Sequence, residues 1–435
     1  MLDPKYIRKN VTLVKEGIRK KRIQLDLDYW LELDKKRRKQ QKKIDESKHQ
    51  QKITSQNLKN IEDNQEKQKL IQKTKKNKIK IKKLQKELDK IEKEWKSILM
   101  EIPNPPSPDM PEGKDESENV TVKEWGEKTK FNFVPQDHMS LGKKLDLIDI
   151  EKAAQVSGSR FYYLKNEAVL LQMALINFVF NTLTDENIIQ KIIQEKKLQL
   201  SSKPFIPMIP PVMIRNEVQE KIHRVFGDQT YKLPEDKLNL VASAEHTMAP
   251  YYMNEIINES DLPLRYIGYS TAFRREAGTY GKDMGGILRT HQFDKLEMES
   301  FTTAETGIEE QKFIVALQEY LVQQLGIPYR LVHVCTGDTG KPDYDQYDIE
   351  CWIPSQNKYR ETHTSDYMTD YQTRGIRSYY KTKEGEKKLL HTNDATAFAI
   401  GRILIAILEN NQQKDGSIVV PKVLQSWLNG KKIIQ

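Results

Sequence analysis

The stretch Ser270–Phe301 contains residue types that could hold a nucleotide. Charged and aromatic residues occupy every other position of its second half, "ILRTHQFDKLEMESF": Arg289, His291, Phe293, Lys295, Glu297 and Glu299. Residues two apart share one face of a β-strand, so these side chains are expected on one side and Leu296 and Met298 on the other.

A preceding strand is predicted to add Arg274 and Glu276, with the glycine-rich loop "AGTYGKDMGG" between the two strands. Arginine suits two-pronged phosphate contacts, and Phe293 could stack on a flat base. Glu297 could take an ammonium group. The alternative is an exposed hairpin with cross-strand ion pairs.

A second candidate is "HTNDATAFAIGRILIAILENNQQKDG", His391–Gly416, which predicts one helix that is apolar nearly all round from Phe398 to Leu408. Arg402 lies inside this run. A buried guanidinium needs an anion, because leaving it unpaired costs several kcal/mol. That anion is either a core carboxylate or a phosphate. Thr396 and its small neighbours at the helix start would leave room for a small ligand.

Two further polar groups are candidates. Glu361 and Thr364 lie close together in "NKYRETHTSDYMTDYQTRG", and carboxylate plus hydroxyl oxygens are ligands that Mg²⁺ prefers. Glu245 in "ASAEH" is a weaker candidate. No phosphate-binding P-loop and no dinucleotide fingerprint occurs. Four histidines lack metal-ligand spacing: His246, His291, His333 and His363.

Composition narrows the class of protein. The 435 residues carry a net charge of +9, with 71 basic and 62 acidic residues, which favours a polyanionic partner. The two cysteines, Cys335 and Cys351, form no disulfide framework. The N-terminus lacks a secretory signal, and no run approaches the roughly 20 apolar residues of a membrane span. We therefore expect a cytoplasmic protein with no membrane partner.

The first hundred residues predict an all-α domain with a long antiparallel coiled-coil hairpin at about 28–100. Apolar residues recur at Ile81, Leu84, Leu88, Ile91, Trp95 and Ile98. An earlier seam has Trp30, Leu33, Ile44, Leu58 and Ile61, with polar middle positions that predict weak central packing. The proline-rich segment 101–120 ends this pattern and predicts domains at 1–110 and 111–435.

Ten lysines and no acidic residue lie between Lys67 and Lys86. One reading is a solvated helix face. The other is an arm that follows a nucleic-acid backbone, since lysines neutralise phosphates without reading bases. Charge does not separate these readings.

The remainder alternates short β-like runs with amphipathic helices, few of them spaced for repeated βαβ units. The predicted fold class is therefore α+β, an antiparallel β-sheet domain flanked by helices.

These motifs together resemble a known family. "FRREAG" with "GGILRTHQFDKLE" resembles the second signature motif of class II aminoacyl-tRNA synthetases, in the form used by seryl-tRNA synthetases. "GSRFYYLKNEAVLLQMALINF" resembles the first motif region, and the Arg402 helix with "AILENNQQKDGSIVVPKVL" the third. The likeness also covers the N-terminal hairpin, hence essentially the whole chain.

The resemblance implies roles for individual residues. The implied catalytic residues are Arg274, Arg289 and Arg402. The implied ATP-binding residues are Arg274, Arg275, Glu276, Arg289, Thr290, Phe293, Glu361, Thr362, His363, Thr364 and Arg402. The implied serine-binding residues are Ser243, Ala244, Glu245, Arg274, Glu297 and Thr396. Glu361 and Thr364 are the implied Mg²⁺ ligands. The implied tRNA-binding residues are Lys73, Lys75, Lys76, Lys78, Lys80, Lys82 and Lys83.

The implied activity is serine–tRNA ligation, with ATP and serine forming seryl-adenylate before transfer to the 3′ end of tRNA(Ser). The long variable arm of that tRNA would be gripped by the lysine-rich hairpin, tRNA(Sec) is a second candidate substrate, and a homodimer is expected. One alternative is a synthetase-like tRNA-binding protein that has lost activation. The other is an amino-acid:carrier-protein ligase, whose relatives lack the hairpin.

Three places depart from the family pattern. "ETHTSD" puts His363 and Asp366 near the implied metal site, and Asp394 replaces an asparagine. "IHRVFGDQTYKLPED" lacks the customary Gly-Thr-Gly turn.

Overall fold

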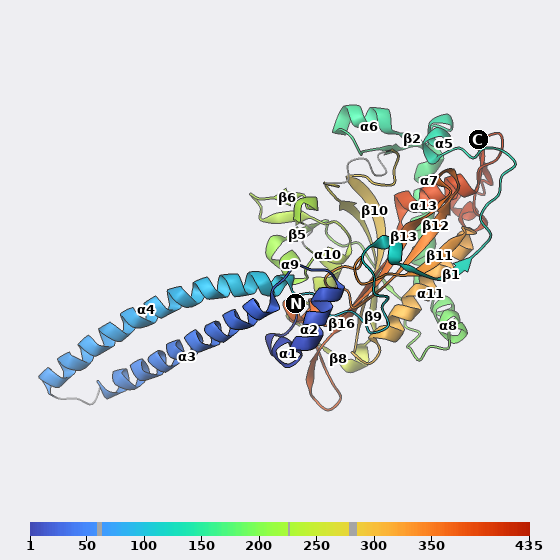
Figure 1. Cartoon of the computed structure of the whole chain (residues 1–435). Coiled ribbons are helices and arrows are strands. Elements are labelled where there is room, and N and C mark those ends of the chain that lie inside the picture. The colour runs from blue at the N-terminus through green and yellow to red at the C-terminus, as the bar shows by residue number, and fades with distance from the viewer. Residues whose placement is uncertain (59–62, 225–226, 278–284) are drawn as a thin grey trace. The chain divides into compact units, whose positions relative to one another are not determined.

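The computed structural model describes residues 1–58, 63–224, 227–277 and 285–435 of the chain (Figure 1). Leu2–Pro105 form one compact unit, and Met1 with Pro106–Gln435 form the other. Ile61 of the predicted seam and most of the glycine-rich loop lie outside the described residues.

The N-terminal unit is all-α. Its helices are α1 Pro4–Lys9, α2 Val11–Lys20, α3 Leu27–Asn57 and α4 Asn64–Glu101. Asp26 and Asp63 begin the two long helices, because each carboxylate accepts a backbone N–H of the first turn. Helices α3 and α4 pair as the predicted coiled-coil hairpin, which is confirmed.

Packing along the hairpin changes from apolar to polar. At the base, Trp30 and Trp95 stack with ring centroids 5.8 Å apart, and Leu88 is fully buried. In the middle, Gln40 Nε2 donates to Glu87 at 2.9 Å, and Asn77 Nδ2 donates to the Ser47 carbonyl at 2.8 Å. Hydrogen bonds therefore replace apolar contacts in the region where the sequence lacks them.

The C-terminal unit is built on an eight-stranded sheet in the order β1-β11-β12-β13-β16-β10-β9-β4. Within this sheet, as far as the structure describes it, β4 pairs with β9 in parallel and all other neighbouring strands pair antiparallel. The predicted antiparallel α+β fold is therefore confirmed. The strands are β1 Val120–Trp125, β4 Ile206–Met208, β9 Leu264–Phe273, β10 Gln292–Thr302, β11 Tyr329–His333, β12 Asp345–Ile353, β13 Lys358–Thr369 and β16 His391–Ala399.

Smaller elements surround this sheet. The short strands are β2 Ile148–Asp149, β3 Tyr163–Leu164, β5 Met213–Arg215, β6 Lys232–Leu233, β7 Leu238–Leu240, β8 Ile256–Asn258, β14 Tyr379–Lys381, β15 Lys387–Leu389, β17 Ile418–Val419 and β18 Ile433–Ile434. The other helices are α5 His138–Lys144, α6 Ile150–Ser157, α7 Asn166–Leu183, α8 Glu186–Glu195, α9 Asn216–Lys221, α10 Glu245–Met248, α11 Gly307–Leu325, α12 Tyr371–Ile376 and α13 Ile400–Asn410.

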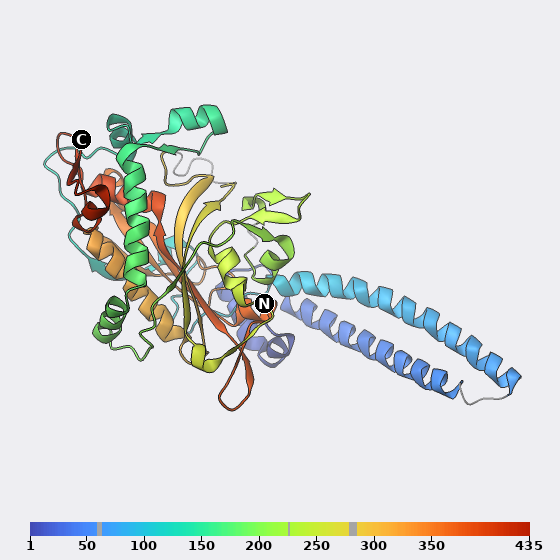
Figure 2. The same cartoon turned by 180° about the vertical axis from the view of Figure 1, so that it is seen from behind.

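One face of the large sheet carries the core. Helices α7, α11 and α13 pack there (Figure 2). Their apolar residues join Leu296 and Met298 of β10 in one buried cluster. The alternation predicted for β10 is therefore confirmed for Leu296 and Met298. The opposite face of β10 is left for polar residues.

No single helix within the described ranges is long and apolar enough to cross a membrane; α7 and α8 meet that test only as a pair bent by 69°.

The base of the hairpin depends on buried apolar side chains. Leu88→Ala should destabilise the α3–α4 hairpin by about 2–5 kcal/mol, because the cavity it leaves cannot be filled by the neighbouring helix. Hydrogen exchange of the hairpin amides in the full chain measures this. Ile79→Ala is the matched control on the same helix, since Ile79 is 71% exposed. Equal exchange rates in both variants would contradict the packing described.

Candidate active site

The site lies on the polar face of the β9–β10 hairpin. The strands pair in register from Phe273 with Gln292 to Leu264 with Phe301. Phe293, Lys295 and Glu297 share the face opposite the core, as predicted for these three residues.

Four residues predicted for these strands lie outside them. Arg274 and Glu276 follow the end of β9, and Arg289 and His291 precede β10, so that part of the prediction is wrong. Glu276 has φ +48°, a left-handed conformation that a strand does not adopt. The loop backbone, rather than strand alternation, therefore brings Arg274 and Arg289 toward Phe293.

The segment around Arg402 also differs from the prediction of one helix. His391–Ala399 is strand β16, and only Ile400–Asn410 is helical as α13. β16 lies between β13 and β10, and its interior residues are buried on both faces. The apolar run that predicted a helix, 398–408, lies almost entirely in α13, whereas five of the nine residues of β16 are polar. Thr396 consequently lies on a strand, and Arg402 in the first turn of α13.

Glu361 and Thr364 lie on β13 rather than in a loop. The register between β12 and β13 shifts between Ile349 and Glu350, which leaves Thr362 as an extra residue in β13. Positions three apart would otherwise face opposite sides of a strand, and this bulge lets both line one cavity. Gln318 of α11 ties the neighbouring strands together, because its Nε2 donates to the carbonyls of Thr364 and Thr396.

These elements enclose a cavity of about 130 Å³. It is lined by Arg274, Glu276, Ile287, Leu288, Arg289, Thr290, Phe293, Lys295, Glu361, Thr362, Thr364, Thr396, Ala399, Gly401 and Arg402. The three arginines predicted to be catalytic thus share one cavity, although they come from separate parts of the chain.

Charged side chains in the cavity contact one another directly. Arg402 Nη1 lies 2.6 Å from Glu361 Oε1 and 2.9 Å from its carbonyl oxygen. Burial opposes ionisation of Glu361, but Arg402 outweighs it and holds the pKa of this carboxyl below its usual value. Burial and then the nearby Arg402 lower the pKa of Arg274. The guanidinium groups of Arg274 and Arg402 are therefore close enough to repel each other.

Aromatic and polar contacts orient the remaining groups. The Arg274 guanidinium lies 5.2 Å from the Phe293 ring centroid, and its Nε donates to the Ala242 carbonyl at 3.2 Å. Arg289 Nη1 lies 3.5 Å from Glu276 Oε2. The hydroxyls of Thr364 and Thr396 are 3.2 Å apart.

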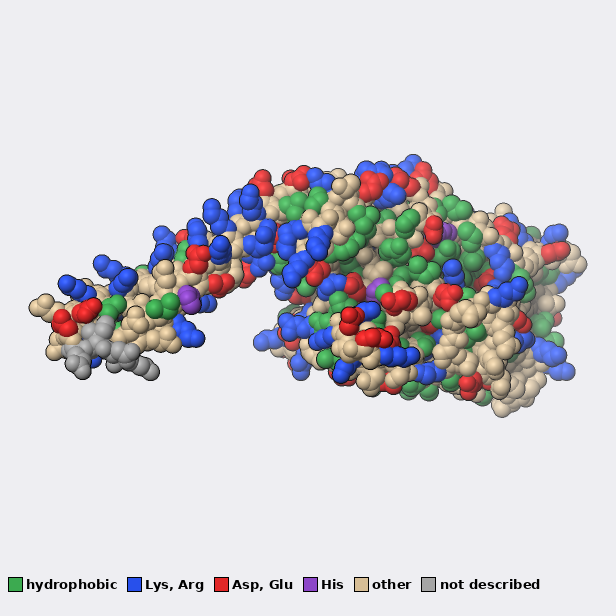
Figure 3. All heavy atoms as spheres, turned by 90° about the horizontal axis from the view of Figure 1, so that it is seen from below, with side chains coloured by type: hydrophobic (Ala, Val, Ile, Leu, Met, Phe, Trp, Pro, Cys, Tyr) green, Lys and Arg blue, Asp and Glu red, His purple; other side chains and the backbone are tan. Residues whose placement is uncertain are grey.

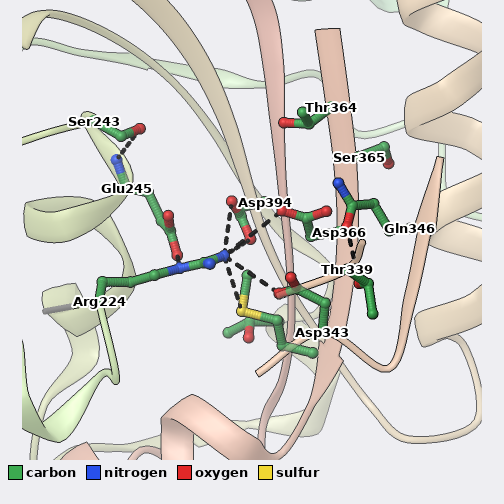
Figure 4. A network of polar contacts seen from close by, with 12 residues as sticks. Arg224, Ser243, Glu245, Thr339, Asp343, Gln346, Thr364, Ser365, Asp366 and Asp394 are labelled. Atoms are coloured by element: carbon green, nitrogen blue, oxygen red, sulfur yellow. Dashed lines mark hydrogen bonds and ion pairs between the residues drawn. The ribbon is translucent and has the colours of Figure 1, made fainter. Parts of the chain in front are cut away.

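Four of the predicted serine-binding residues form a buried wall beside the cavity: Ser243, Ala244, Glu245 and Glu297. Figure 4 shows Ser243 and Glu245 of this wall. Arg274 and Thr396 line the cavity itself. Lys295 joins this wall to the cavity, since its Nζ lies 2.6 Å from Glu297 Oε2 and 3.5 Å from Ser243 Oγ. The Glu245 N–H donates to Ser243 Oγ at 3.4 Å. Burial of Ala244 and Glu245 is complete or nearly so.

Three of the predicted ATP-binding residues direct their side chains to protein groups: Arg275, Thr362 and His363. The Arg275 guanidinium lies 5.7 Å from the Tyr231 ring centroid and is not among the cavity-lining residues. Thr362 lines the cavity, but its hydroxyl donates to the Ile349 carbonyl. The His363 ring is fully buried against Phe398.

The cavity offers few ligands for a metal ion. No group of three or more His, Cys, Asp or Glu side chains within the described residues could hold a metal ion. Glu361 and Thr364 still offer two hard oxygens on one cavity wall, as a nucleotide-bound Mg²⁺ would need.

Two further charged residues were given no role by the sequence reasoning. Lys295 was placed in the β10 alternation without a role, and it lines the cavity. Arg224, which ion-pairs with Glu245 at 2.5 Å, is a single cation in an irregular segment, and no sequence pattern marks it.

Sequence comparisons agree with this geometry. Residues 230–411 match the tRNA synthetase class II core domain (G, H, P, S and T), and residues 1–106 match the seryl-tRNA synthetase N-terminal domain. The serine–tRNA ligase of Dictyoglomus turgidum is 40% identical over 100% of this chain and 99% of its own length. That of Treponema denticola is 39% identical over the full length of both chains.

Solved structures give the same result. Seryl-tRNA synthetase from Pyrococcus horikoshii, complexed with ATP, superposes with a TM-score of 0.85 at 35% identity, covering 100% of this chain and 99% of that one. The fold and motifs define a class II aminoacyl-tRNA synthetase. Full-length identity to serine–tRNA ligases then shows that the chain belongs to the seryl-tRNA synthetase family.

Next to Glu245 of the buried wall, His246 is fully buried and its neutral form is favoured. Its Nδ1 accepts the Ala242 N–H at 3.3 Å and lies 3.1 Å from Gln219 Nε2. Burial lowers the pKa of His246 from 6.5 to about 3. The unfolded chain takes up a proton below about pH 6.5, and the folded one does not until about pH 3. The stability contributed by neutral His246 is therefore present above pH 6.5 and lost as the pH falls.

His246→Asn keeps an acceptor but does not titrate. Between about pH 7 and about pH 5.5, its free energy of unfolding should fall by about 1 kcal/mol less than that of the unaltered chain. Urea unfolding at the two pH values measures the difference. An identical pH dependence in both proteins would show that His246 titrates in the folded state.

Proposed function

We propose that the cavity activates serine with ATP and that its arginines carry the reaction. The observation that supports this most strongly is the meeting of Arg274, Arg289 and Arg402 at one cavity with Phe293. A triphosphate needs several cations, and an adenine ring needs a flat apolar surface. The site has both.

The proposed roles follow the geometry. Arg274 holds the α-phosphate and Arg402 the γ-phosphate, with Arg289 as a further phosphate contact. Phe293 packs against adenine and Glu276 lies near its edge. Arg402 must leave Glu361 to reach a phosphate, and this exchanges one anion for another at the same guanidinium.

The chemistry needs no protein nucleophile. A serine carboxylate oxygen attacks the α-phosphorus in line, and the bond to the bridging oxygen breaks to release pyrophosphate. A ribose hydroxyl of the tRNA's terminal adenosine then attacks the seryl carbonyl, and AMP leaves. Positioning and charge stabilisation carry the rate.

Mg²⁺ would neutralise phosphate charge when bound with ATP, and Glu361 and Thr364 would hold it. Serine itself is proposed to lie among Ser243, Ala244, Glu245, Glu297 and Thr396. There Glu297 would meet the ammonium group, and Arg274 would meet the carboxylate.

Loss of one arginine should be severe. Arg274→Ala or Arg402→Ala should each lower serine-dependent ATP–pyrophosphate exchange about 10²–10³-fold, because charge developing on the phosphates loses a fixed cation. Arg215→Ala is a control in an exposed position of the same domain. Normal exchange by either cavity variant would refute its assigned role.

The hairpin is proposed to bind the long variable arm of tRNA(Ser) and, as a second candidate, that of tRNA(Sec). All seven predicted contact lysines of α4 are exposed: Lys73, Lys75, Lys76, Lys78, Lys80, Lys82 and Lys83. Figure 3 shows basic side chains along this arm. Such a surface binds backbone phosphates and shape rather than base sequence.

Replacing those seven lysines with glutamine should spare ATP–pyrophosphate exchange and strongly reduce aminoacylation of tRNA. The salt dependence of tRNA binding should weaken as well, since fewer counterions are released. Trimming residues 35–95 should also spare ATP–pyrophosphate exchange, and it should abolish aminoacylation. Loss of exchange in the lysine variant would instead indicate a structural role for the arm.

The expected homodimer has one supporting feature. Helix α7 exposes Val169, Leu170 and Met173, three apolar side chains on one element. We propose that a second copy covers them. A cytoplasmic location stays a prediction, supported by two cysteines that form no disulfide.

A further inference from the structure

A single buried arginine meets carboxylates from four parts of the chain (Figure 4). Arg224 Nε lies 2.5 Å from Glu245 Oε1, and its Nη2 lies 3.2 Å from Asp394 Oδ1. The same nitrogen lies 3.5 Å from Asp343 Oδ1 and 3.6 Å from Asp366 Oδ2. Arg224 is 9% exposed and all four carboxylates are buried.

The cluster has more carboxyl groups than cations. Glu299 lies directly across from Asp394 in the β10–β16 pairing, and its carboxylate oxygens have no hydrogen-bond partner within the described residues. Burial, reinforced by Glu245, raises the pKa of both Asp394 and Glu299. Burial also opposes ionisation of Glu245, but Arg224 outweighs it and holds this pKa low. Glu245 is therefore the carboxylate that Arg224 keeps charged.

Contacts connect the cluster to the cavity. Gln372 Nε2 donates to the Glu245 oxygen that Arg224 contacts, at 2.7 Å, so this carboxylate is held from two sides. Through its own N–H, Glu245 bonds Ser243 Oγ, and Lys295 reaches the same oxygen from the cavity wall. A shift of Glu245 would therefore reach the amino-acid side of the site.

The cluster joins residues that are far apart in the sequence. Arg224 contacts Asp366 of β13 and Asp394 of β16, which lie directly across from each other in these two strands. Buried carboxylates are costly unless a cation pairs with them. Arg224 thus compensates these two acids.

We propose that Arg224 is a positioning residue for amino-acid binding, which compensates Asp366 and Asp394 and thereby fixes Glu245 beside Ser243. This inference rests on the proposed serine site. If the ion pairs were purely structural, their loss would lower stability and would not change the KM for serine more than the KM for ATP.

The test uses the full chain and serine-dependent ATP–pyrophosphate exchange. Arg224→Met should raise the KM for serine about tenfold or more and leave the KM for ATP within about twofold, because the variant disturbs only the amino-acid side. Adding Asp394→Asn to Arg224→Met removes one unbalanced acid and should recover part of the serine affinity. Arg224→Lys should be intermediate, since one ammonium cannot make the forked contacts of a guanidinium. Arg215→Met is the exposed control.

Equal changes in both KM values, or no recovery by Asp394→Asn, would overturn the proposal. If Arg224→Met does not fold, Arg224→Lys carries the same comparison.

Absence of serine-dependent exchange in the unaltered chain would overturn the proposed function instead. In that event the midpoints of thermal unfolding still test the compensation. Arg224→Met should lower the midpoint and Asp394→Asn should partly restore it, whereas purely additive losses would contradict the compensation.

Discussion

A guanidinium group taken out of water must meet an anion, and the catalytic unit meets this requirement in three ways. Arg265 is fully buried and makes a two-pronged pair with Glu310, at 2.6 and 2.8 Å. Arg224 is surrounded by carboxylates. Arg402 instead faces a cavity and pairs with Glu361. The first pair links β9 to α11, whereas the last is the pair proposed to exchange its carboxylate for a phosphate.

That exchange explains why the site is built from separate elements. A loop supplies Arg274 and Arg289, a bulged strand supplies Glu361 and Thr364, and the start of a helix supplies Arg402. Arg274 and Arg402 repel each other, so a polyanion bound at both guanidinium groups would be stabilised by the whole arrangement. The surrounding strands hold this geometry before the ligand binds, so less reorganisation is needed during the reaction.

Sequence alone predicted the fold class, the coiled-coil hairpin and the two faces of β10, because each follows from the regular spacing of apolar and polar residues within one segment. It failed where tertiary position decides the structure. The apolar run 398–408 was predicted to belong to one helix that starts at His391, but the mostly polar residues His391–Ala399 form a central strand, and no proline marks the change from strand to helix. Arg274 and Glu276 lie beyond the strand end because Glu276 adopts a left-handed conformation. The role of Arg224 depends entirely on partners distant in the sequence.

The most direct test of the account is a crystal structure of the chain with a non-hydrolysable ATP analogue and serine. The account predicts one nucleotide in the cavity, with Arg274 on its α-phosphate, Phe293 against its adenine, and Arg402 moved from Glu361 to its γ-phosphate. A nucleotide bound elsewhere, or phosphates touched by neither arginine while Arg402 stays on Glu361, would contradict it.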